Sequence, residues 1–599
     1  MSGSTDSKAI MTGAEFLLHP TDPATVFTPE DFSEEQQQVA STAAEFLANE
    51  ILPAAAEIEA KNFAVTRALL KKAGDLGLMG VDVPEVYGGV AMDKVTSAIV
   101  ADRMAGLGSF SVAFSAHTGI GTLPIVWYGT EAQKQKYLPK LATGEWLSAY
   151  ALSEATSGSD AMNIRTRAVK DGDSYVLNGE KMWITNAGFA DLFTVFAKIA
   201  DPAEPDISKA KMSAFLIERS TPGLAIGAEE HKMGIRGSST CPLVLNDCRI
   251  PLENLLGEEG KGHHIAFNIL NIGRFKLGAA CVGGARTALA NAIQYARDRK
   301  AFGKSITEFG LVQEKIADAV ARIYVAESMA YRTIGAIDAA LAGAEDAKEI
   351  QKRIEEYAIE CSVLKVWGSE MLDAVVDHAV QIYGGYGYVE EYPAERAYRD
   401  SRINRIFEGT NEINRLIISG FVMKRAMEGR LPLLPAIKAL MDELTAPPSF
   451  SSAEAPEDPL SREEKMLANA KKLFLFASGA ASRKYLNALA DQQEIMAALA
   501  DMVLEIYALD SALARVRKLS VSADAKAQLA QSATQLYAAV AFQAVESSAR
   551  KVLAAVAEGD ALRTQLAILR RLAKHEPANA IALGRHIAQA AIERGAYPL

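Results

Sequence analysis

The spacing of apolar residues divides the chain into two helical ends and a β-rich middle. From Ser33 to about residue 140, apolar residues recur at helical spacing, interrupted at residues 83–89 by a proline and paired glycines. Short apolar and β-branched runs follow at residues 192–198, 212–218, 224–229 and 241–251, which is typical of strands. Long helical patterns return at Gly262. Strands gathered between two helical segments predict a separate β domain of roughly 110 residues.

A tight hairpin is predicted inside this β segment. Asn178-Gly179 separates Tyr175-Val-Leu from Lys181-Met-Trp-Ile-Thr, and Asn-Gly between two β runs is a strong signal for a two-residue turn. We therefore expect the chain to reverse direction at these two residues.

The C-terminal segment is predicted to form an additional helical domain. Residues 445–462 contain Ala-Pro-Pro-Ser-Phe-Ser-Ser and Glu-Asp-Pro-Leu, a composition typical of linkers. The residues beyond are rich in alanine and helical in pattern, so we expect a small bundle that packs on the preceding domain. The predicted organisation is an N-terminal arm (1–34), a helical domain (35–148), a β domain (149–260), a second helical domain (261–440), a linker (445–462) and an additional helical domain (463–599).

Composition and charge narrow the class of protein. The 599 residues are 49% hydrophobic and 23% charged, as in ordinary globular proteins, and a net charge of −11 without a Lys/Arg run argues against nucleic acid. Neither the four cysteines nor the eight histidines have metal-ligand spacing, so we expect no metal site and free, mostly buried thiols. The first thirty residues resemble neither a signal nor a transit peptide, and no run of eighteen apolar residues occurs. A cytoplasmic protein is expected.

One carboxylate is a candidate for chemistry. Glu408 lies between apolar Phe407 and flexible Gly409, at the entry to a helix that Thr410 is expected to cap. Removed from water in a cleft, such a carboxylate would have a raised pKa and act as a base near neutral pH. The alternative is a glutamate that merely complements the helix dipole.

Four other segments are candidates for ligand contacts, and each has a plainer interpretation. No Gly-x-Gly-x-x-Gly follows a strand and no P-loop occurs, so a nucleotide cofactor must be held in another way. Residues 150–160 offer hydroxyls and glycine amides, or simply form a turn. Trp183-Ile-Thr185 suits a flat ring, or packs in the core. The basic residues of segment 297–304 could bind a phosphate, or could cap the C-terminal end of a helix. Arg274 could bind an anionic ligand, or could form a salt bridge within the protein.

Taken together in this order, the motifs resemble the acyl-CoA dehydrogenase family over roughly residues 35–430. The resemblance is closest to the very-long-chain branch, which has a helical C-terminal extension. The motifs that carry it are Tyr150-Ala-Leu-Ser-Glu-Ala-Thr-Ser-Gly-Ser-Asp, Lys181-Met-Trp-Ile-Thr-Asn, Arg299-Lys-Ala-Phe-Gly-Lys, Gln381-Ile-Tyr-Gly-Gly-Tyr-Gly and Ile406-Phe-Glu-Gly-Thr-Asn-Glu-Ile. Where many relatives have Glu-Pro-Gly-Ala-Gly-Ser-Asp, this chain has Glu-Ala-Thr-Ser-Gly-Ser-Asp.

The resemblance implies a fold and a set of site residues. The fold is a helical domain, a β-barrel domain and a four-helix-bundle domain with FAD held between them, followed by the extra helical domain. Glu408 is the implied base, because Gly273, where a minority of the family carries the base, has no side chain. Asn271, Arg274, Gly409 and Ser159 would contact the acyl-CoA. Residues 299 and 302, supplied by a neighbouring subunit, belong to the implied FAD contacts, which are Tyr150, Leu152, Ser153, Gly158, Ser159, Trp183, Ile184, Thr185, Arg299, Phe302, Phe309, Gln381, Gly384, Gly385, Thr410 and Glu412.

The implied reaction is the α,β-dehydrogenation of acyl-CoA to trans-2-enoyl-CoA in fatty-acid β-oxidation, with electrons passed to electron-transfer flavoprotein. Medium to long acyl chains are expected, because segment 117–124 lies near where relatives set the depth of the pocket and its small residues permit a deep one. A homodimer is expected. The alternatives are an acyl-CoA oxidase, which passes electrons to oxygen, and a non-catalytic assembly factor. The extension is expected either to pack within the chain or to contact a membrane peripherally.

Overall fold

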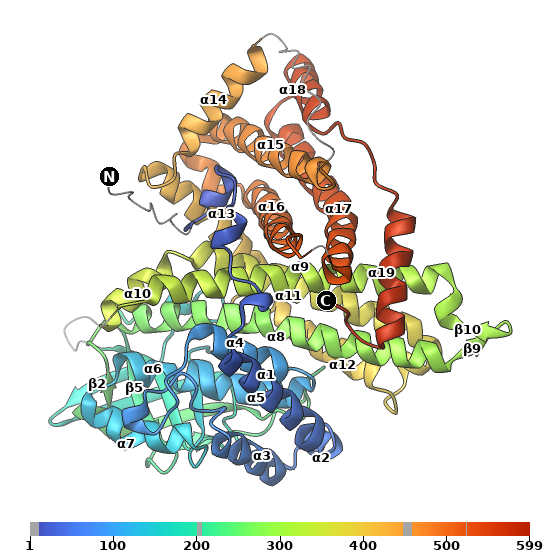
Figure 1. The fold of residues 1–599 in the computed structure, drawn as a ribbon. Coiled ribbons are helices and arrows are strands. Elements are labelled where there is room, and N and C mark those ends of the chain that lie inside the picture. Colours follow the sequence, from blue (N-terminus) through green and yellow to red (C-terminus); the bar gives the residue numbers. More distant parts are fainter. Residues whose placement is uncertain (1–10, 201–205, 345, 447–457, 523) are drawn as a thin grey trace, which may run out of the picture.

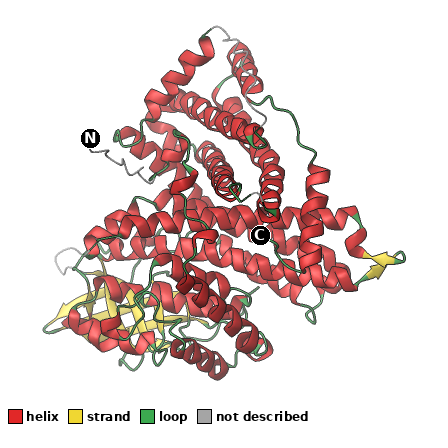
Figure 2. Cartoon of the chain, viewed as in Figure 1, coloured by secondary structure: helices red, strands yellow, loops and turns green. Residues whose placement is uncertain are grey.

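The computed structural model describes residues 11–200, 206–344, 346–446, 458–522 and 524–599 (Figure 1). Most of the predicted linker therefore lies outside the described residues. Helices dominate, and the strands gather in one region, apart from a small hairpin at the far side of the molecule (Figure 2).

The N-terminal domain is helical, as its apolar spacing predicts. Its first long helix begins at Glu34 because Ser33 caps it, with Ser33 Oγ accepting from the backbone N–H of Gln36. A π-helical turn, Ala116–Gly121, interrupts the last part of the domain. The helices are α1 (Glu34–Phe46), α2 (Ala55–Glu59), α3 (Phe63–Asp75), α4 (Lys94–Arg103), α5 (Gly108–Ser115), α6 (Leu123–Tyr128) and α7 (Glu131–Ala142).

The middle domain is an open β-sheet, so the prediction of a closed β-barrel is wrong. The hydrogen-bonded order is β6-β7-β3-β2-β4-β5-β8, and β1 pairs with β4. The end strands β6 and β8 have only three and two residues, and among the described residues each pairs along one edge only. The edges therefore do not meet. The strands are β1 (Ser148–Ala151), β2 (Arg167–Asp171), β3 (Ser174–Thr185), β4 (Leu192–Ile199), β5 (Met212–Glu218), β6 (Leu224–Ile226), β7 (Thr240–Pro251) and β8 (Leu255–Leu256).

The predicted turn at Asn178-Gly179 is also wrong, because β3 runs through both residues. The reversal between β2 and β3 falls instead at Gly172-Asp173. Gly179 has a φ of +152° and stands where the register between β3 and β7 shifts. A Cβ at Gly179 would lie 2.6 Å from Thr166 Oγ1. The glycine therefore permits a bulge and a close approach of neighbouring backbone.

Four long helices form the second helical domain. They are α8 (Gly262–Asp298), α9 (Gly310–Leu341), α11 (Ala358–Tyr383) and α13 (Asn411–Met427), and α8 packs most extensively on α11. Within the described part of the chain, α8 alone is long and apolar enough to span a membrane, but it is mostly buried and serves as the central core helix. The remaining elements are β9 (Lys300–Ala301), β10 (Lys304–Ser305), α10 (Ala347–Glu355), α12 (Pro393–Ser401) and α14 (Leu433–Thr445).

The C-terminal extension is helical and packs on this domain. In Figure 1 its helices, coloured orange to red, lie on the outer side of the long helices of the second helical domain. Helices α16 and α17 contact α9, α16 also contacts α13, and all share one hydrophobic core. Its alanine-rich faces are therefore buried within the chain. The helices are α15 (Ser461–Tyr485), α16 (Gln493–Leu519), α17 (Ala525–Val556), α18 (Gly559–Leu572) and α19 (Ala580–Arg594).

A buried arginine fastens the extension to the rest of the chain. The side chain of Arg515 on α16 is only 1% exposed and pairs at 2.7 Å with Glu327 on α9 and at 2.7 Å with Glu30 of the N-terminal arm. Glu327 pairs further with Arg286 on α8 at 3.0 Å. One guanidinium thus joins three segments that are distant in sequence.

We expect Arg515→Met to destabilise the fold by about 3 kcal/mol, because it leaves two carboxylates short of a buried partner. The matched control is Arg517→Met on the same helix, which should cost less than about 1 kcal/mol because its partners Asp458 and Glu464 are 40% and 48% exposed. Urea unfolding followed by circular dichroism measures both. Equal midpoints for the two variants would contradict the role given to Arg515.

Candidate active site

A cavity of about 430 Å³ lies between the N-terminal helices and the second helical domain. This volume suits an organic ligand. The lining is mostly apolar and comes from α5, the π-helical turn, α8, α11 and α12, with the apolar residues Leu107, Val112, Ala116, Gly119, Ile120, Leu277, Ala280, Leu372 and Val376 among its members. Charged side chains reach the wall at only a few points, and Glu408 is one of them.

Glu408 occupies a strained turn directly before α13. Its φ is +58° and that of Gly409 is +79°, and a residue other than glycine adopts this region only where its surroundings hold it there. Asn414 Nδ2 donates to the carbonyl oxygen of Gly409 at 2.8 Å and to that of Thr410 at 3.0 Å. Thr410 Oγ1 accepts from the Ile413 N–H, which confirms the predicted N-cap. The turn thereby places the carboxylate on the cavity wall.

The surroundings of Glu408 suit a base at neutral pH. Burial raises the pKa of its carboxyl to about 7, against the opposing effects of the Arg274 and Lys365 cations. Among the described residues, its buried Oε2 has no hydrogen-bond partner. A Cβ on Gly273 would lie 2.6 Å from this oxygen, so the absence of a side chain there makes room for the carboxylate. An unpartnered oxygen of this kind is free to accept a proton.

Arg274 lies beside the same turn. It is buried, and its Nε donates to the carbonyl oxygen of Glu408 at 3.3 Å. Its Nη1 donates to Asn271 Oδ1 at 2.9 Å. In the part of the chain that the structure describes, Arg274 forms no salt bridge. The alternative interpretation of Arg274 as a salt-bridge residue is therefore not supported there. Asn271, Arg274, Glu408 and Gly409, predicted from separate segments, are therefore brought together.

The segments predicted to flank a flat ring also meet near the cavity. The backbone N–H of Met182 donates to the carbonyl oxygen of Ser153 at 3.0 Å, which joins the end of β3 to the residues after β1. Thr185 lines the same cavity as Glu408. Trp183 is 55% exposed, an unusual amount for an indole in a sheet. Tyr150, Leu152 and Ile184 are buried beside them, and Gly158 and Ser159 follow in an exposed turn.

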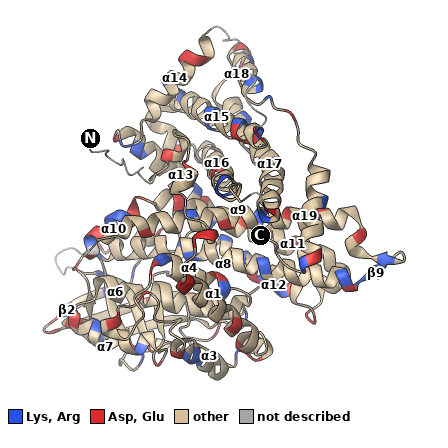
Figure 3. Ribbon diagram, in the orientation of Figure 1, with Lys and Arg blue, Asp and Glu red and all other residues tan. Residues whose placement is uncertain are grey.

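The remaining predicted contacts form a second cluster, far from Glu408. Arg299 directly follows α8, and Phe302 lies in the turn of the β9–β10 hairpin, where the ribbon in Figure 3 is coloured blue for Lys and Arg. The guanidinium of Arg299 lies 5.6 Å from the ring centroid of Tyr386, which places the hairpin beside Gln381, Gly384 and Gly385. Phe309 packs edge-on against Phe302, and Phe302 is 95% exposed.

One chain does not unite the two clusters. Helix α8 carries Arg274 about a third of the way along and ends at Asp298, so at 1.5 Å per residue the hairpin lies roughly 36 Å from Arg274. Thr410 and Glu412, at the start of α13, belong to the first cluster. The site predicted from the sequence is therefore present as two separate halves.

Several polar residues near the site were missed by the sequence analysis. Lys365 is fully buried on α11, and its Nζ donates to the Gly409 carbonyl oxygen at 2.7 Å. Lys276 on the cavity wall pairs with Asp82 at 2.7 Å. A single lysine inside an apolar helical run was the available signal for both, because a buried charge needs a partner.

The four cysteines are free and buried, as predicted.

Comparison with known proteins agrees with the fold. Family models described as the N-terminal, middle and C-terminal domains of acyl-CoA dehydrogenase match residues 33–145, 149–248 and 260–423, and a further C-terminal domain model of the same name matches residues 469–571. Fold and site therefore define a dehydrogenase, an enzyme of the oxidoreductase class.

The chain belongs to the acyl-CoA dehydrogenase family. It is 45% identical to a probable acyl-CoA dehydrogenase of Bacillus subtilis, over 98% of each chain. It is 38% identical to the human mitochondrial very long-chain specific acyl-CoA dehydrogenase, over 74% of this chain and 69% of that one. A crystal structure of acyl-CoA dehydrogenase complexed with FAD from Bacillus anthracis superposes with a TM-score of 0.94 and 46% identity, over 98% of this chain and 100% of that one.

Proposed function

We propose that the protein dehydrogenates saturated acyl-CoA thioesters at the Cα–Cβ bond, with Glu408 as the base. The observation that carries this proposal is the unpartnered, buried carboxylate on the wall of an apolar cavity, with a pKa raised to about 7. A base with a pKa near the working pH abstracts a proton most effectively. The apolar lining suits a fatty acyl chain and excludes water.

The residues present fit FAD. Trp183 and Phe302 expose aromatic surfaces, and a Cβ added at Gly158, Gly384 or Gly385 would meet nothing within 4 Å, so backbone is open to a ligand there. The basic hairpin at Arg299 suits a pyrophosphate. When bound, FAD supplies the acceptor for the two electrons and the β-hydrogen.

The chain's own residues perform the proton chemistry. Glu408 takes the α-proton of the thioester, and the thioester oxygen must then gain negative charge. By resemblance to the family, the backbone N–H of Glu408 donates to that oxygen, so that the donor is aimed before the reaction begins. Arg274 donates to the carbonyl oxygen of Glu408 and thereby fixes the orientation of the peptide group between Glu408 and Gly409.

The test is turnover of the purified protein with saturated acyl-CoAs and a ferrocenium-type acceptor. Loss of the oxidised flavin colour on mixing with acyl-CoA, together with an enoyl-CoA product, is the expected result. A yellow protein that no acyl-CoA bleaches would contradict it and would favour the assembly-factor alternative.

We further propose electron-transfer flavoprotein as the electron acceptor. The relatives above are named dehydrogenases, and an oxidase would pass electrons to oxygen instead. Anaerobically reduced protein is expected to reoxidise slowly in air and rapidly on addition of electron-transfer flavoprotein. Rapid reoxidation in air would identify an oxidase.

Medium to long acyl chains in fatty-acid β-oxidation are the proposed substrates. At Gly119 a larger side chain would shorten the space for the acyl chain. A Cβ at Gly119 would meet one described atom within 4 Å, Lys276 Cδ at 3.9 Å, so the cavity is open there. Gly119→Leu should lower the ratio of kcat/KM for a long over a short acyl-CoA by about tenfold or more. Gly420→Leu is the matched control, because Gly420 also has open space but lies outside the cavity lining. An unchanged ratio of kcat/KM for Gly119→Leu would contradict the assignment of this part of the cavity to the acyl chain.

A homodimer is proposed because the predicted FAD contacts Arg299 and Phe302 lie roughly 36 Å from Arg274, which lies beside the Glu408 turn of the same chain. A second copy that presents Arg299 and Phe302 would complete the site and cover the exposed phenyl ring. Analytical ultracentrifugation should find a dimer, and a monomer with full FAD content would contradict the proposal.

The packing of the extension on α9 and α13 favours a structural role for it over peripheral membrane contact. Flotation with phospholipid vesicles distinguishes the two roles, and we expect the protein to remain in the lipid-free fraction. Cytoplasmic localisation remains our expectation, and cell fractionation tests it.

A further inference from the structure

A chain of polar contacts joins the C-terminal extension to the turn that carries Glu408. It comprises one residue of α16, two of α13 and two of α11, and we call it the polar relay: Asp501, Arg415, Glu370, Asn411 and Lys365. These five residues lie outside the cavity lining, so a direct contact with the acyl chain does not explain them.

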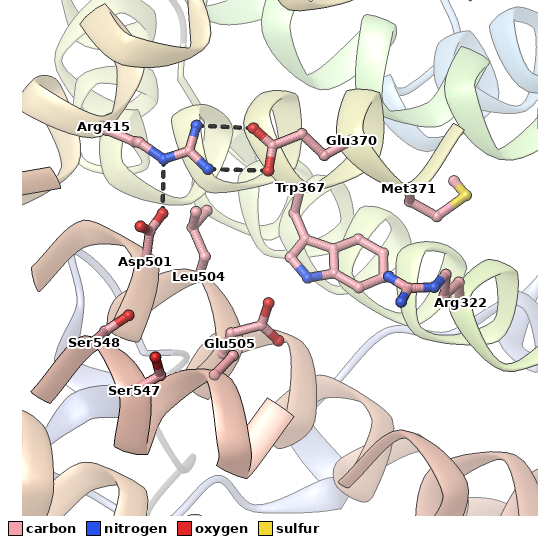
Figure 4. Close-up of a pocket in the computed structure, with 11 residues that line it drawn as sticks. Arg322, Trp367, Glu370, Met371, Arg415, Asp501, Leu504, Glu505, Ser547 and Ser548 are labelled. Atoms are coloured by element: carbon pink, nitrogen blue, oxygen red, sulfur yellow. Dashed lines mark hydrogen bonds and ion pairs between the residues drawn. The ribbon is translucent and has the colours of Figure 1, made fainter. Parts of the chain in front are cut away.

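The outer end of the relay lies at the junction of the extension and the second helical domain. Arg415 Nε donates to Asp501 Oδ1 at 2.7 Å, and its two terminal nitrogens donate to the two oxygens of Glu370 at 2.8 and 2.9 Å (Figure 4). A bidentate arginine–carboxylate pair fixes geometry as well as charge. A pocket of about 360 Å³ adjoins these three residues. Arg415 thus cross-links α13 to both α11 and α16.

The inner end of the relay is buried and reaches the strained turn. Asn411 Nδ2 donates to Glu370 Oε1 at 3.0 Å, and its Oδ1 accepts from Lys365 Nζ at 2.6 Å. The same Nζ donates to the Gly409 carbonyl oxygen at 2.7 Å. Lys365 is 0% exposed and Asn411 is 2% exposed. Fully satisfied polar networks in such surroundings are rigid.

The position of this turn decides where the carboxylate lies. Glu408 has a left-handed φ and stands three residues before Asn411, so a shift of the α13 start against α11 displaces Glu408 with it. A displacement of about 1 Å at a reacting group is enough to cost about a hundredfold in rate.

We propose that the polar relay positions the base. Lys365 is a positioning residue, because it holds the carbonyl of Gly409 and does not touch the reacting atoms, and the extension acts on the same turn through Asp501. The inference rests on the proposed role of Glu408 and adds to it a role in catalysis for the extension.

The two ends of the relay should differ in their effect on the pH profile. The groups that face the Glu408 carboxylate are Arg274 from α8, Lys365 from α11 and Tyr150 from β1. Loss of the Lys365 cation removes an interaction that lowers the pKa of Glu408, so the acid limb should move to higher pH. Asp501 is not among these groups, so its loss should leave the limb in place.

The experiment uses the holoenzyme, a saturated acyl-CoA and a ferrocenium acceptor. Lys365→Met should lower kcat about a hundredfold and move the acid limb of kcat/KM upward, with FAD content retained. Asp501→Asn, at a partly exposed position that tolerates change, should lower kcat about tenfold with little change in KM and an unmoved limb. Asp458→Asn is the matched control, since it weakens the ion pair between Asp458 and Arg517, away from the polar relay, and should leave kcat unchanged.

The inference also requires that the effects depend on the base. In a Glu408→Gln background, Asp501→Asn should cause no further loss of the residual rate, because the group that it positions is gone. Wild-type kcat in Asp501→Asn, or equal losses in Asp501→Asn and Asp458→Asn, would overturn the role of the extension. An unmoved acid limb in folded Lys365→Met would overturn the role of Lys365. Full activity of Glu408→Gln alone would instead overturn the proposed function.

Discussion

Glu408→Gln is expected to lower kcat with acyl-CoA by about a thousandfold, because glutamine keeps the shape of the side chain but cannot accept the α-proton. The fold should tolerate the change, since burial already favours the uncharged form of this carboxyl by raising its pKa to about 7. Stopped-flow measurement of flavin bleaching gives the rate of the chemical step directly. Flavin absorbance and thermal unfolding confirm that the variant is loaded and folded.

The matched control for this substitution is Glu428→Gln, at the opposite end of the same helix and exposed to solvent. It makes the same chemical change outside the cavity and should leave turnover unaltered. Retention of more than about a tenth of the wild-type rate by Glu408→Gln would show that another group takes the proton.

The second large effect is that of acid on the wild-type enzyme. The base works only when deprotonated, and burial raises the pKa of Glu408 to about 7. The value of kcat/KM should therefore fall tenfold for each pH unit below 7, so that at pH 5 it is about a hundredth of its plateau. An ordinary glutamate, with a pKa near 4.5, would leave the rate almost flat over this range.

This pH profile is measured with one acyl-CoA under subsaturating conditions, between pH 5 and 9, so that it reports on the free enzyme. The profile of Glu408→Gln serves as the control, because its residual rate should lose the acid limb. A wild-type midpoint below pH 5 would contradict the burial-based account of the base.

Local patterns of the sequence predicted the elements of the fold but not their long-range pairing. Strand β5 has the predicted bounds, Met212–Glu218, because its apolar run ends at turn residues on either side. The open sheet was not predicted, because closure of a sheet depends on whether its two edge strands pair with each other. This depends on where β6 and β8 lie relative to each other in the folded chain. Asn178-Gly179 was interpreted as a turn because the residues around it do not indicate that Thr166 packs closely against Gly179.

In the candidate site, too, features set by neighbouring residues were predictable and long-range contacts were not. Thr410 and the turn at Glu408 were predictable, since capping and glycine flexibility act over a few residues. The contacts of the polar relay were not, because Lys365 and Gly409 are separated by 44 positions and Arg415 and Asp501 by 86. The family motifs placed Arg299 and Phe302 in the site, whereas geometry shows that one chain leaves them roughly 36 Å from Arg274.

That separation ties cofactor loading to protein concentration. If each FAD is held by side chains of two copies, its affinity and the affinity of the copies for one another are thermodynamically linked, so each must strengthen the other by the same factor. Dilution should then release FAD from wild-type protein, and excess FAD should delay dissociation. A cell that makes little of this protein would hold much of it in the empty form.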